Sequence, residues 1–142
     1  MRCVLDSSFV GCWFLPDEKS AAGQRVFDAY QAGRIEFDVP ELLAYEIPNL
    51  FLSAFRRKRL EADELQEARA VFDLIEFEYH SQTDAIYRRR MFQFAEKHQL
   101  TAYDAAYLEL ADRLQLPLLT LDGKLLAAAR TENLETAVKS DK

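Results

Sequence analysis

Short apolar runs alternate with longer helical patterns along the chain, and this alternation restricts the fold more than any other feature. A helix between two successive strands allows them to lie parallel in one sheet that is covered on both sides. The sequence therefore predicts an α/β fold, with a central parallel β-sheet flanked by helices on both faces. The predicted strands are RCVLD (2–6), IEFDVP (35–40), EFEYH (76–80), LPLLTLD (116–122) and LETAVK (134–139). The predicted helices cover residues 7–14, 19–33, 40–59, 62–75, 84–98, 101–115 and 123–132.

The helical pattern over residues 40–59 contains a proline. Its apolar stripe includes Leu43, Ile47 and Phe51, as an amphipathic helix requires. Pro48 removes one backbone hydrogen bond and crowds the preceding turn. We expect a kink at Pro48, or a helix that restarts there.

Length and composition indicate one folded domain over residues 1–142, because 49% of the residues are hydrophobic and 12% are aromatic. Cys3 and Cys12 are too few for a disulfide framework, so we expect two buried apolar side chains. We find no signal-peptide pattern and no apolar run near the roughly 20 residues of a membrane span. The expectation is a soluble, cytoplasmic domain.

The net charge of −6 argues against general affinity for nucleic acids, which rests on basic surfaces. Two basic segments, FRRKRL and YRRRMF, could still contact a phosphate backbone. They could equally reflect the preference of basic residues for helix C-termini. The candidate backbone contacts are Arg56, Arg57, Lys58, Arg59, Arg88, Arg89 and Arg90.

Four acids fall where the predicted fold brings elements together. Asp6 and Asp122 each end a predicted strand, and the carboxyl ends of parallel strands share one edge of the sheet, where ligands bind. Asp104 lies in the first turn of a helix, and Glu46 lies within an apolar helical stretch. Each also has a simpler explanation: Asp6 as a helix cap, Asp104 in a capping arrangement with Thr101, Asp122 in an Asp-Gly turn, Glu46 as a solvated residue.

Taken together, these carboxylates favour a metal site. Several carboxylates in one crevice repel one another unless a cation compensates their charge. An all-oxygen donor set selects Mg²⁺ or Mn²⁺ rather than Zn²⁺. Side chains that would support the four acids are Ser7, Ser8, Asn49 and Thr120.

Other chemistries fit poorly. His80 and His98 have no His or Cys partners at zinc-ligand spacing. The chain offers no plausible serine and histidine pair for a nucleophilic triad, and no glycine-rich phosphate loop.

The same residues resemble a known family. Asp6-Ser7-Ser8 after the first strand, Glu46 followed by Asn49, YDAAYLELA around Asp104 and LLTLDGKL around Asp122 together resemble the PIN domain, and more narrowly the VapC-type toxins of toxin–antitoxin pairs. The resemblance covers essentially the whole chain.

The resemblance implies a metal-dependent endoribonuclease that hydrolyses RNA phosphodiester bonds. Asp6, Glu46, Asp104 and Asp122 would bind Mg²⁺ or Mn²⁺, with Asp6 and Asp104 as direct ligands. It also implies a homodimer and a cognate antitoxin that covers the active-site groove.

Three alternatives remain open from the sequence. The first is a housekeeping PIN-domain nuclease that processes RNA without an antitoxin. The second is a receiver domain, which usually carries paired acids after its first strand and a strand-ending lysine, neither of which is found here. The third is a non-catalytic PIN-fold binding module, whose mark would be the loss of an acid.

Overall fold

The computed structural model of the chain describes residues 1–81 and 83–137. Its elements follow the predicted order of strands and helices. They are β1 (Arg2–Leu5), α1 (Ser7–Phe14), the 3₁₀ turn η1 (Pro16–Glu18), α2 (Ala21–Gln31), β2 (Glu36–Pro40), α3 (Leu43–Arg56), α4 (Ala62–Leu74), β3 (Phe77–His80), α5 (Ala85–His98), α6 (Ala102–Leu114), β4 (Leu118–Leu119) and α7 (Gly123–Thr131).

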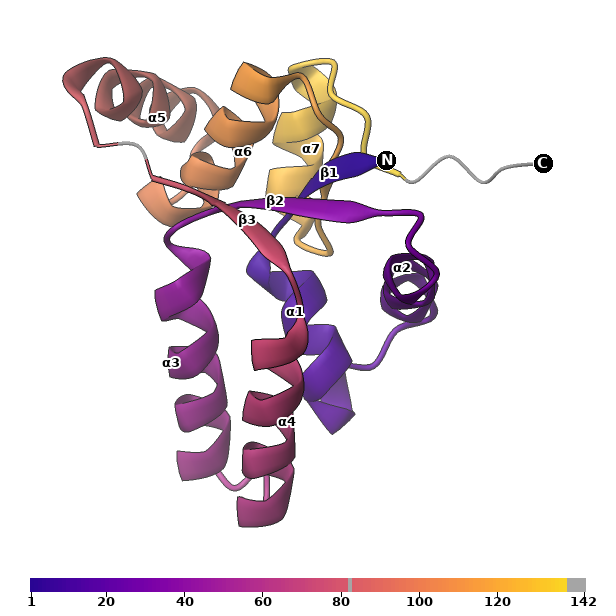
Figure 1. The fold of residues 1–142 in the computed structure, drawn as a ribbon. Coiled ribbons are helices and arrows are strands. Elements are labelled where there is room, and N and C mark those ends of the chain that lie inside the picture. Colours follow the sequence, from indigo (N-terminus) through magenta and orange to yellow (C-terminus); the bar gives the residue numbers. More distant parts are fainter. Residues whose placement is uncertain (82, 138–142) are drawn as a thin grey trace.

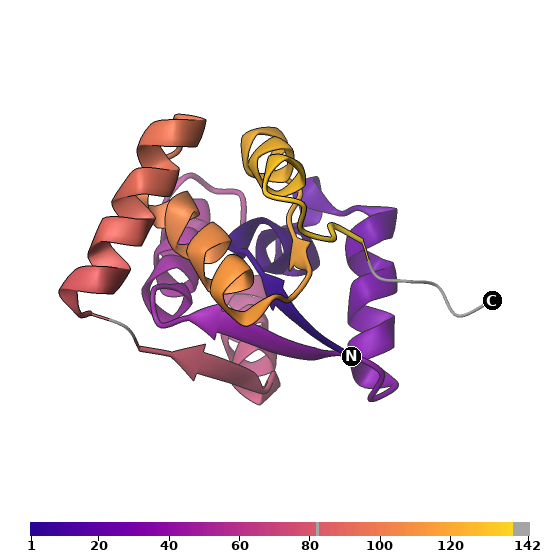
Figure 2. The ribbon, with the colours of Figure 1, turned by 90° about the horizontal axis from the view of Figure 1, so that it is seen from above.

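The four strands form one parallel sheet in the order β3-β2-β1-β4. Helices cover both of its faces, as predicted: α5, α6 and α7 lie above the sheet in Figure 1, and α1, α2, α3 and α4 lie below it. The view from above shows the first group in front of the strands (Figure 2). Because α1, α3 and α7 follow parallel strands and α6 leads back to the next one, all four begin at the carboxyl edge of the sheet.

Residues of β1 are buried on both faces, as in a central parallel strand. Cys3, Val4 and Leu5 have no exposed surface, and they join a core to which the helices of both layers contribute. Aromatic rings pack the lower layer, with Phe37 of β2 in contact with Trp13, Tyr30 and Phe77. Both cysteines are buried and free, as expected.

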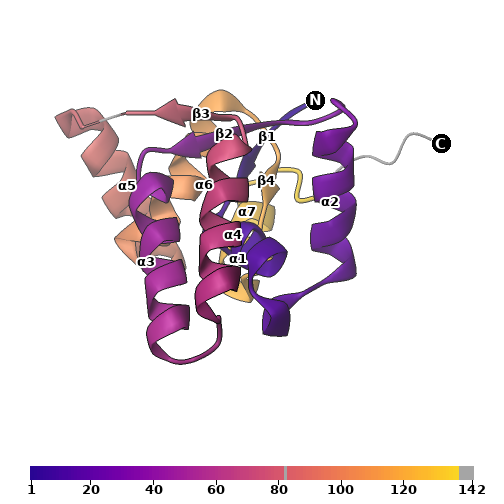
Figure 3. The same cartoon turned by 60° about the horizontal axis from the view of Figure 1, so that its bottom comes forward.

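Helix α3 runs without interruption from Leu43 to Arg56, so a restart at Pro48 is wrong, while the alternative, a kink, stays a prediction. The proline removes the N–H that would bind the carbonyl of Ala44, but both residues are exposed, so water can bind this carbonyl. Helix α3 then packs beside α4, and residues 57–61 join the two at the end far from the sheet (Figure 3).

Two predicted strands differ from the structure. The strand predicted over residues 116–122 is confined to Leu118–Leu119, because the chain then turns toward α7. The described part of LETAVK, residues 134–137, is not a strand, although the N–H of Leu118 donates to the carbonyl of Glu135 (2.8 Å). Val138 and Lys139 lie outside the described residues. Among the described residues, no helix has the length and apolar character needed to cross a membrane.

Candidate active site

The four acids all lie on elements that begin or end at the carboxyl edge of the sheet. Asp6 directly follows β1, Glu46 lies in the first turn of α3, Asp104 lies in the first turn of α6, and Asp122 caps α7. Burial has the largest effect on the pKa of Asp6, Glu46 and Asp104. Beyond it, the charge of Asp104 raises the pKa of Asp6 and Glu46, and the charge of Asp122 raises that of Asp104. The four carboxylates therefore influence one another across this edge.

Asp6 is the most deeply buried of the four, with 3% of its surface exposed. Its Oδ1 accepts hydrogen bonds from the backbone N–H (3.1 Å) and the hydroxyl (2.5 Å) of Ser8, and its Oδ2 accepts one from the Thr120 hydroxyl (2.7 Å). Burial raises the pKa of Asp6 to about 6, although the bonds from Ser8 and Thr120 favour the charged form. Asp6 thus caps α1, as the simpler explanation proposes, but capping alone does not require its carboxylate to be buried.

The same two hydroxyls fix the segment between β4 and α7. The Ser8 hydroxyl accepts a hydrogen bond from the N–H of Leu121 (2.8 Å), and the Thr120 hydroxyl accepts one from the N–H of Asp122 (3.0 Å). Both hydroxyls therefore donate to Asp6 and accept from this segment. They join the start of α1 to residues 120–122 and explain why β4 ends early.

Glu46 is half-buried and bound by a side chain that the sequence analysis did not identify. The hydroxyl of Tyr107, in α6, donates to Glu46 Oε1 (2.5 Å). Burial raises the pKa of Glu46, the bonds from Tyr107 and Ser7 lower it, and the charges of Asp104 and Asp6 raise it. The interpretation of Glu46 as a solvated residue is wrong. One signal was present, since Tyr107 lies one turn after Asp104 on the same helix face.

Asp104 and Asp122 lie at the capped N-termini of α6 and α7, at the carboxyl edge of the sheet. The N–H of Asp104 donates to the hydroxyl of Thr101 (3.1 Å), which caps α6, while its carboxyl group is half-buried. Burial and then the charge of Asp122 raise the pKa of Asp104. Asp122 is exposed and accepts a bond from the N–H of Leu125 (2.9 Å). Both acids therefore have the local capping roles that the simpler explanations assign to them. Their carboxylates also interact, because the charge of Asp122 raises the pKa of Asp104.

The predicted supporting residues differ in their surroundings. Ser8 and Thr120 bind Asp6, as described, and Ser7 contributes to the environment of Glu46. Asn49 is exposed. Its supporting role therefore stays a prediction, which rests on its position one turn after Glu46.

The donor set fits a hard divalent cation in its chemistry, because it consists of carboxylate and hydroxyl oxygens. Over residues 1–81 and 83–137, no three Asp, Glu, His or Cys side chains are close enough to form a complete metal cage. Burial and the charges of neighbouring carboxylates raise the pKa values of Asp6, Glu46 and Asp104, and a bound cation would favour their charged forms.

The two basic segments lie in different places. Arg56 to Arg59 lie at the C-terminal end of α3, about 15 Å along the helix from Glu46 at 1.5 Å per residue. Arg59 is committed within the protein, since it binds Asp17 (2.8 Å) and Glu18 (2.9 Å). Arg56, Arg57 and Lys58 are exposed.

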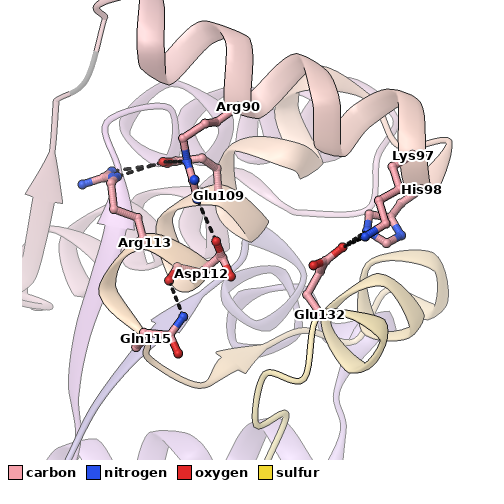
Figure 4. Close-up of polar contacts among 8 residues, drawn as sticks. All are labelled: Arg90, Lys97, His98, Glu109, Asp112, Arg113, Gln115 and Glu132. Carbon is pink, nitrogen blue, oxygen red and sulfur yellow. Dashed lines mark hydrogen bonds and ion pairs between the residues drawn. The ribbon is translucent and has the colours of Figure 1, made fainter.

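Arg88 to Arg90 lie on α5, which has no buried residue. Figure 4 shows polar contacts of this helix, and its Phe94 packs against the core. Arg90 binds Asp112 (2.7 Å) and lies 3.5 Å from Glu109, a fully buried carboxylate that also binds Arg113 (2.9 Å). Arg90 therefore has a structural role, while Arg88 and Arg89 are exposed.

Both histidines are paired with acids. His98 binds Glu132 (2.7 Å), as Figure 4 shows. His80 binds Asp38 (2.7 Å), a fully buried acid of β2 that is also paired with Arg2. The sequence analysis did not identify Asp38, because an acid inside a short strand gives no pattern.

Comparison with known proteins identifies the family of the chain. Residues 3–131 match the family model of the PIN domain. The chain is also 33% identical to Ribonuclease VapC3 of Pyrobaculum aerophilum over 129 residues, which cover 88% of this chain and 92% of that protein.

Two crystal structures are similar to this chain in fold. PAE2754 from Pyrobaculum aerophilum superimposes with a TM-score of 0.63 at 19% identity, covering 90% of this chain and 79% of that one. VapBC2 from Rickettsia felis, bound to a DNA fragment from its promoter, gives a TM-score of 0.63 at 14% identity and covers 96% of this chain and 97% of that one. With a family match over most of its length and a relative of nearly equal extent, the chain belongs to the PIN domain family.

Proposed function

We infer that this protein is a metal-dependent endoribonuclease of the VapC type, the toxin of a toxin–antitoxin pair. The observation that carries this inference is the 33% identity to Ribonuclease VapC3 over nearly the whole of both chains. All four acids of the resemblance are present at one edge of the sheet, which disfavours a non-catalytic binding module. Membership of the PIN family also excludes the receiver domain.

In the proposed site Asp6 and Asp104 are direct metal ligands, and Asp122 and Glu46 bind directly or through water. A divalent cation held there supplies charge compensation at the scissile phosphate and activation of the attacking water. Ser8 and Thr120 hold both oxygens of Asp6, so its carboxylate cannot turn away from the edge. Because the donors are all oxygens, we propose Mg²⁺ or Mn²⁺ as the ion.

Metal dependence tests the proposal. Purified protein should cleave a mixed RNA substrate with Mg²⁺ or Mn²⁺, and excess chelator should abolish the cleavage. Adding either ion back should restore it, because the fold has its own core and does not need the metal to form. Cleavage that persists in chelator would contradict the proposed mechanism.

Exposed aromatic side chains next to the acids support a single-stranded RNA substrate. Tyr45 precedes Glu46 and is 70% exposed, and Tyr103 precedes Asp104 and is 64% exposed. Bases of single-stranded nucleic acids stack on such rings, with about 1–3 kcal/mol per base.

The two basic segments give different expectations for RNA binding. We expect Arg88→Glu with Arg89→Glu, or Arg56→Glu with Arg57→Glu, to weaken RNA binding and to flatten its salt dependence if that segment contacts phosphates. Titrations of RNA at several salt concentrations measure the slope. The matched control is Arg69→Glu with Arg130→Glu, which makes the same charge change at two exposed arginines outside both segments. A variant whose binding has the same salt dependence as the wild type would show that its basic segment does not contact phosphates.

The proposed partners are RNA, a second copy of the chain and a cognate antitoxin protein. The solved VapBC2 complex supports the antitoxin, since this chain covers 97% of that chain in the same fold. Expression of the protein alone should arrest growth, and coexpression with the product of an adjacent small gene should relieve the arrest. Normal growth on expression alone would favour the housekeeping nuclease.

A further inference from the structure

We propose that Tyr107 is a positioning residue of the site, which holds Glu46 in a metal-binding orientation through its hydroxyl. This role rests on the proposed function and adds to it a residue that is not an acid. The hydroxyl lies 2.5 Å from Glu46 Oε1, and Tyr107 is 1% exposed.

The contact joins two elements of the site that lie on opposite layers of the molecule. Glu46 lies in the first turn of α3, which is below the sheet, and Tyr107 lies in α6, which is above it (Figure 1). Tyr107 lies one turn after Asp104, so the same helix that carries one proposed ligand orients another. A change in the position of α6 would therefore move Asp104 and Glu46 together.

The chemistry of the pair favours a positioning role over simple packing. Glutamate has three side-chain torsions, and Glu46 would lose orientation without a fixed donor. The tyrosine ring is enclosed, has only two torsions and presents one hydroxyl, which needs a partner when it is buried. The bond from Tyr107 occupies one lone pair of Oε1, and a carboxylate has about four lone-pair sites, so acceptor capacity remains for a cation or its water. Hydrogen bonds to metal-ligating carboxylates typically change metal affinity or activity by 10–100-fold.

The test is Tyr107→Phe, which keeps the ring and removes only the hydroxyl. We expect Mn²⁺ binding, measured by calorimetry without RNA, to weaken by about tenfold, and kcat for RNA cleavage to fall by a similar factor with KM for RNA unchanged. The matched control is Tyr30→Phe, which removes a partly buried hydroxyl that accepts a bond from the N–H of Glu76 (2.9 Å) in another part of the protein. Its Mn²⁺ affinity should equal that of the wild type.

A double-mutant cycle separates positioning from structural support. In a Glu46→Ala background, Tyr107→Phe should have no further effect on Mn²⁺ affinity, because its role passes through Glu46. An equal loss in both backgrounds, or wild-type affinity in Tyr107→Phe, would overturn the role of Tyr107 and leave the proposed nuclease intact. Failure of the wild type to bind Mn²⁺ and to cleave RNA would instead overturn the proposed function, and this role with it.

Discussion

Replacing Asp104 by asparagine should reduce RNA cleavage by about 10³-fold, because several kcal/mol of metal-dependent stabilisation of the transition state are lost. The amide keeps the size of the side chain and removes its charge. The helix cap is retained, since the hydroxyl of Thr101 accepts a hydrogen bond from the backbone N–H of residue 104, which asparagine also has. Initial rates with saturating Mg²⁺ or Mn²⁺ measure the effect.

The control for this variant is Asp73→Asn, which makes the same chemical change at an exposed position of α4. Its cleavage rate should equal that of the wild type. Thermal unfolding of both variants shows whether the fold is intact. A folded Asp104→Asn protein that cleaves RNA at the wild-type rate would exclude Asp104 from the site.

Replacing Asp6 by asparagine should abolish cleavage and yet stabilise the metal-free protein at neutral pH. Burial raises the pKa of Asp6 from 3.8 to about 6 in the folded protein, so folding disfavours the charged form. At pH 7 this costs about 2–3 kcal/mol of folding free energy at 1.36 kcal/mol per pKa unit. Asparagine carries no charge, and its amide can donate to the Thr120 hydroxyl, which has a second lone pair to accept it.

The raised pKa of Asp6 determines how this effect on stability depends on pH. The contribution of Asp6 to stability is fully present below its unfolded pKa of 3.8 and is lost as the pH rises through about 6. The midpoint of thermal unfolding of Asp6→Asn should therefore exceed that of the wild type by about 7–10 °C at pH 7 and match it near pH 4, in buffer with chelator. A variant less stable than the wild type at pH 7 would show that the hydrogen bonds to Asp6 outweigh its burial.

The elements of the fold were predictable where the pattern is local. The period of the apolar residues gave α2, α4, α5, α6 and α7, and short apolar runs gave β1, β2 and β3. The predictions failed where distant residues decide the outcome. The early end of β4 depends on Ser8, which binds the N–H of Leu121 from 113 residues away. The uninterrupted α3 depends on solvent access at Pro48, which its sequence neighbours do not indicate.

The candidate site shows the same division. Asp6, Glu46, Asp104 and Asp122 could be found from the order of elements, because a parallel sheet brings strand ends to one edge. Tyr107 could not, because its partner Glu46 is 61 residues away and its motif also fits a core residue. Likewise, the commitment of Arg90 to Glu109 and Asp112 reduces one predicted RNA contact to an internal ion pair.

The hydrogen bond between Asp6 and Thr120 joins residues 114 positions apart. Because a ribosome delivers the N-terminus first, Asp6 emerges long before the residues that hold its carboxylate and before β4, which borders β1 in the sheet. A nascent chain therefore carries Asp6 well before it carries the segment that orients the carboxylate. The site can form only after residues 120–122 have left the ribosome, so until then the first acid of the site is without its hydrogen-bonding partner Thr120.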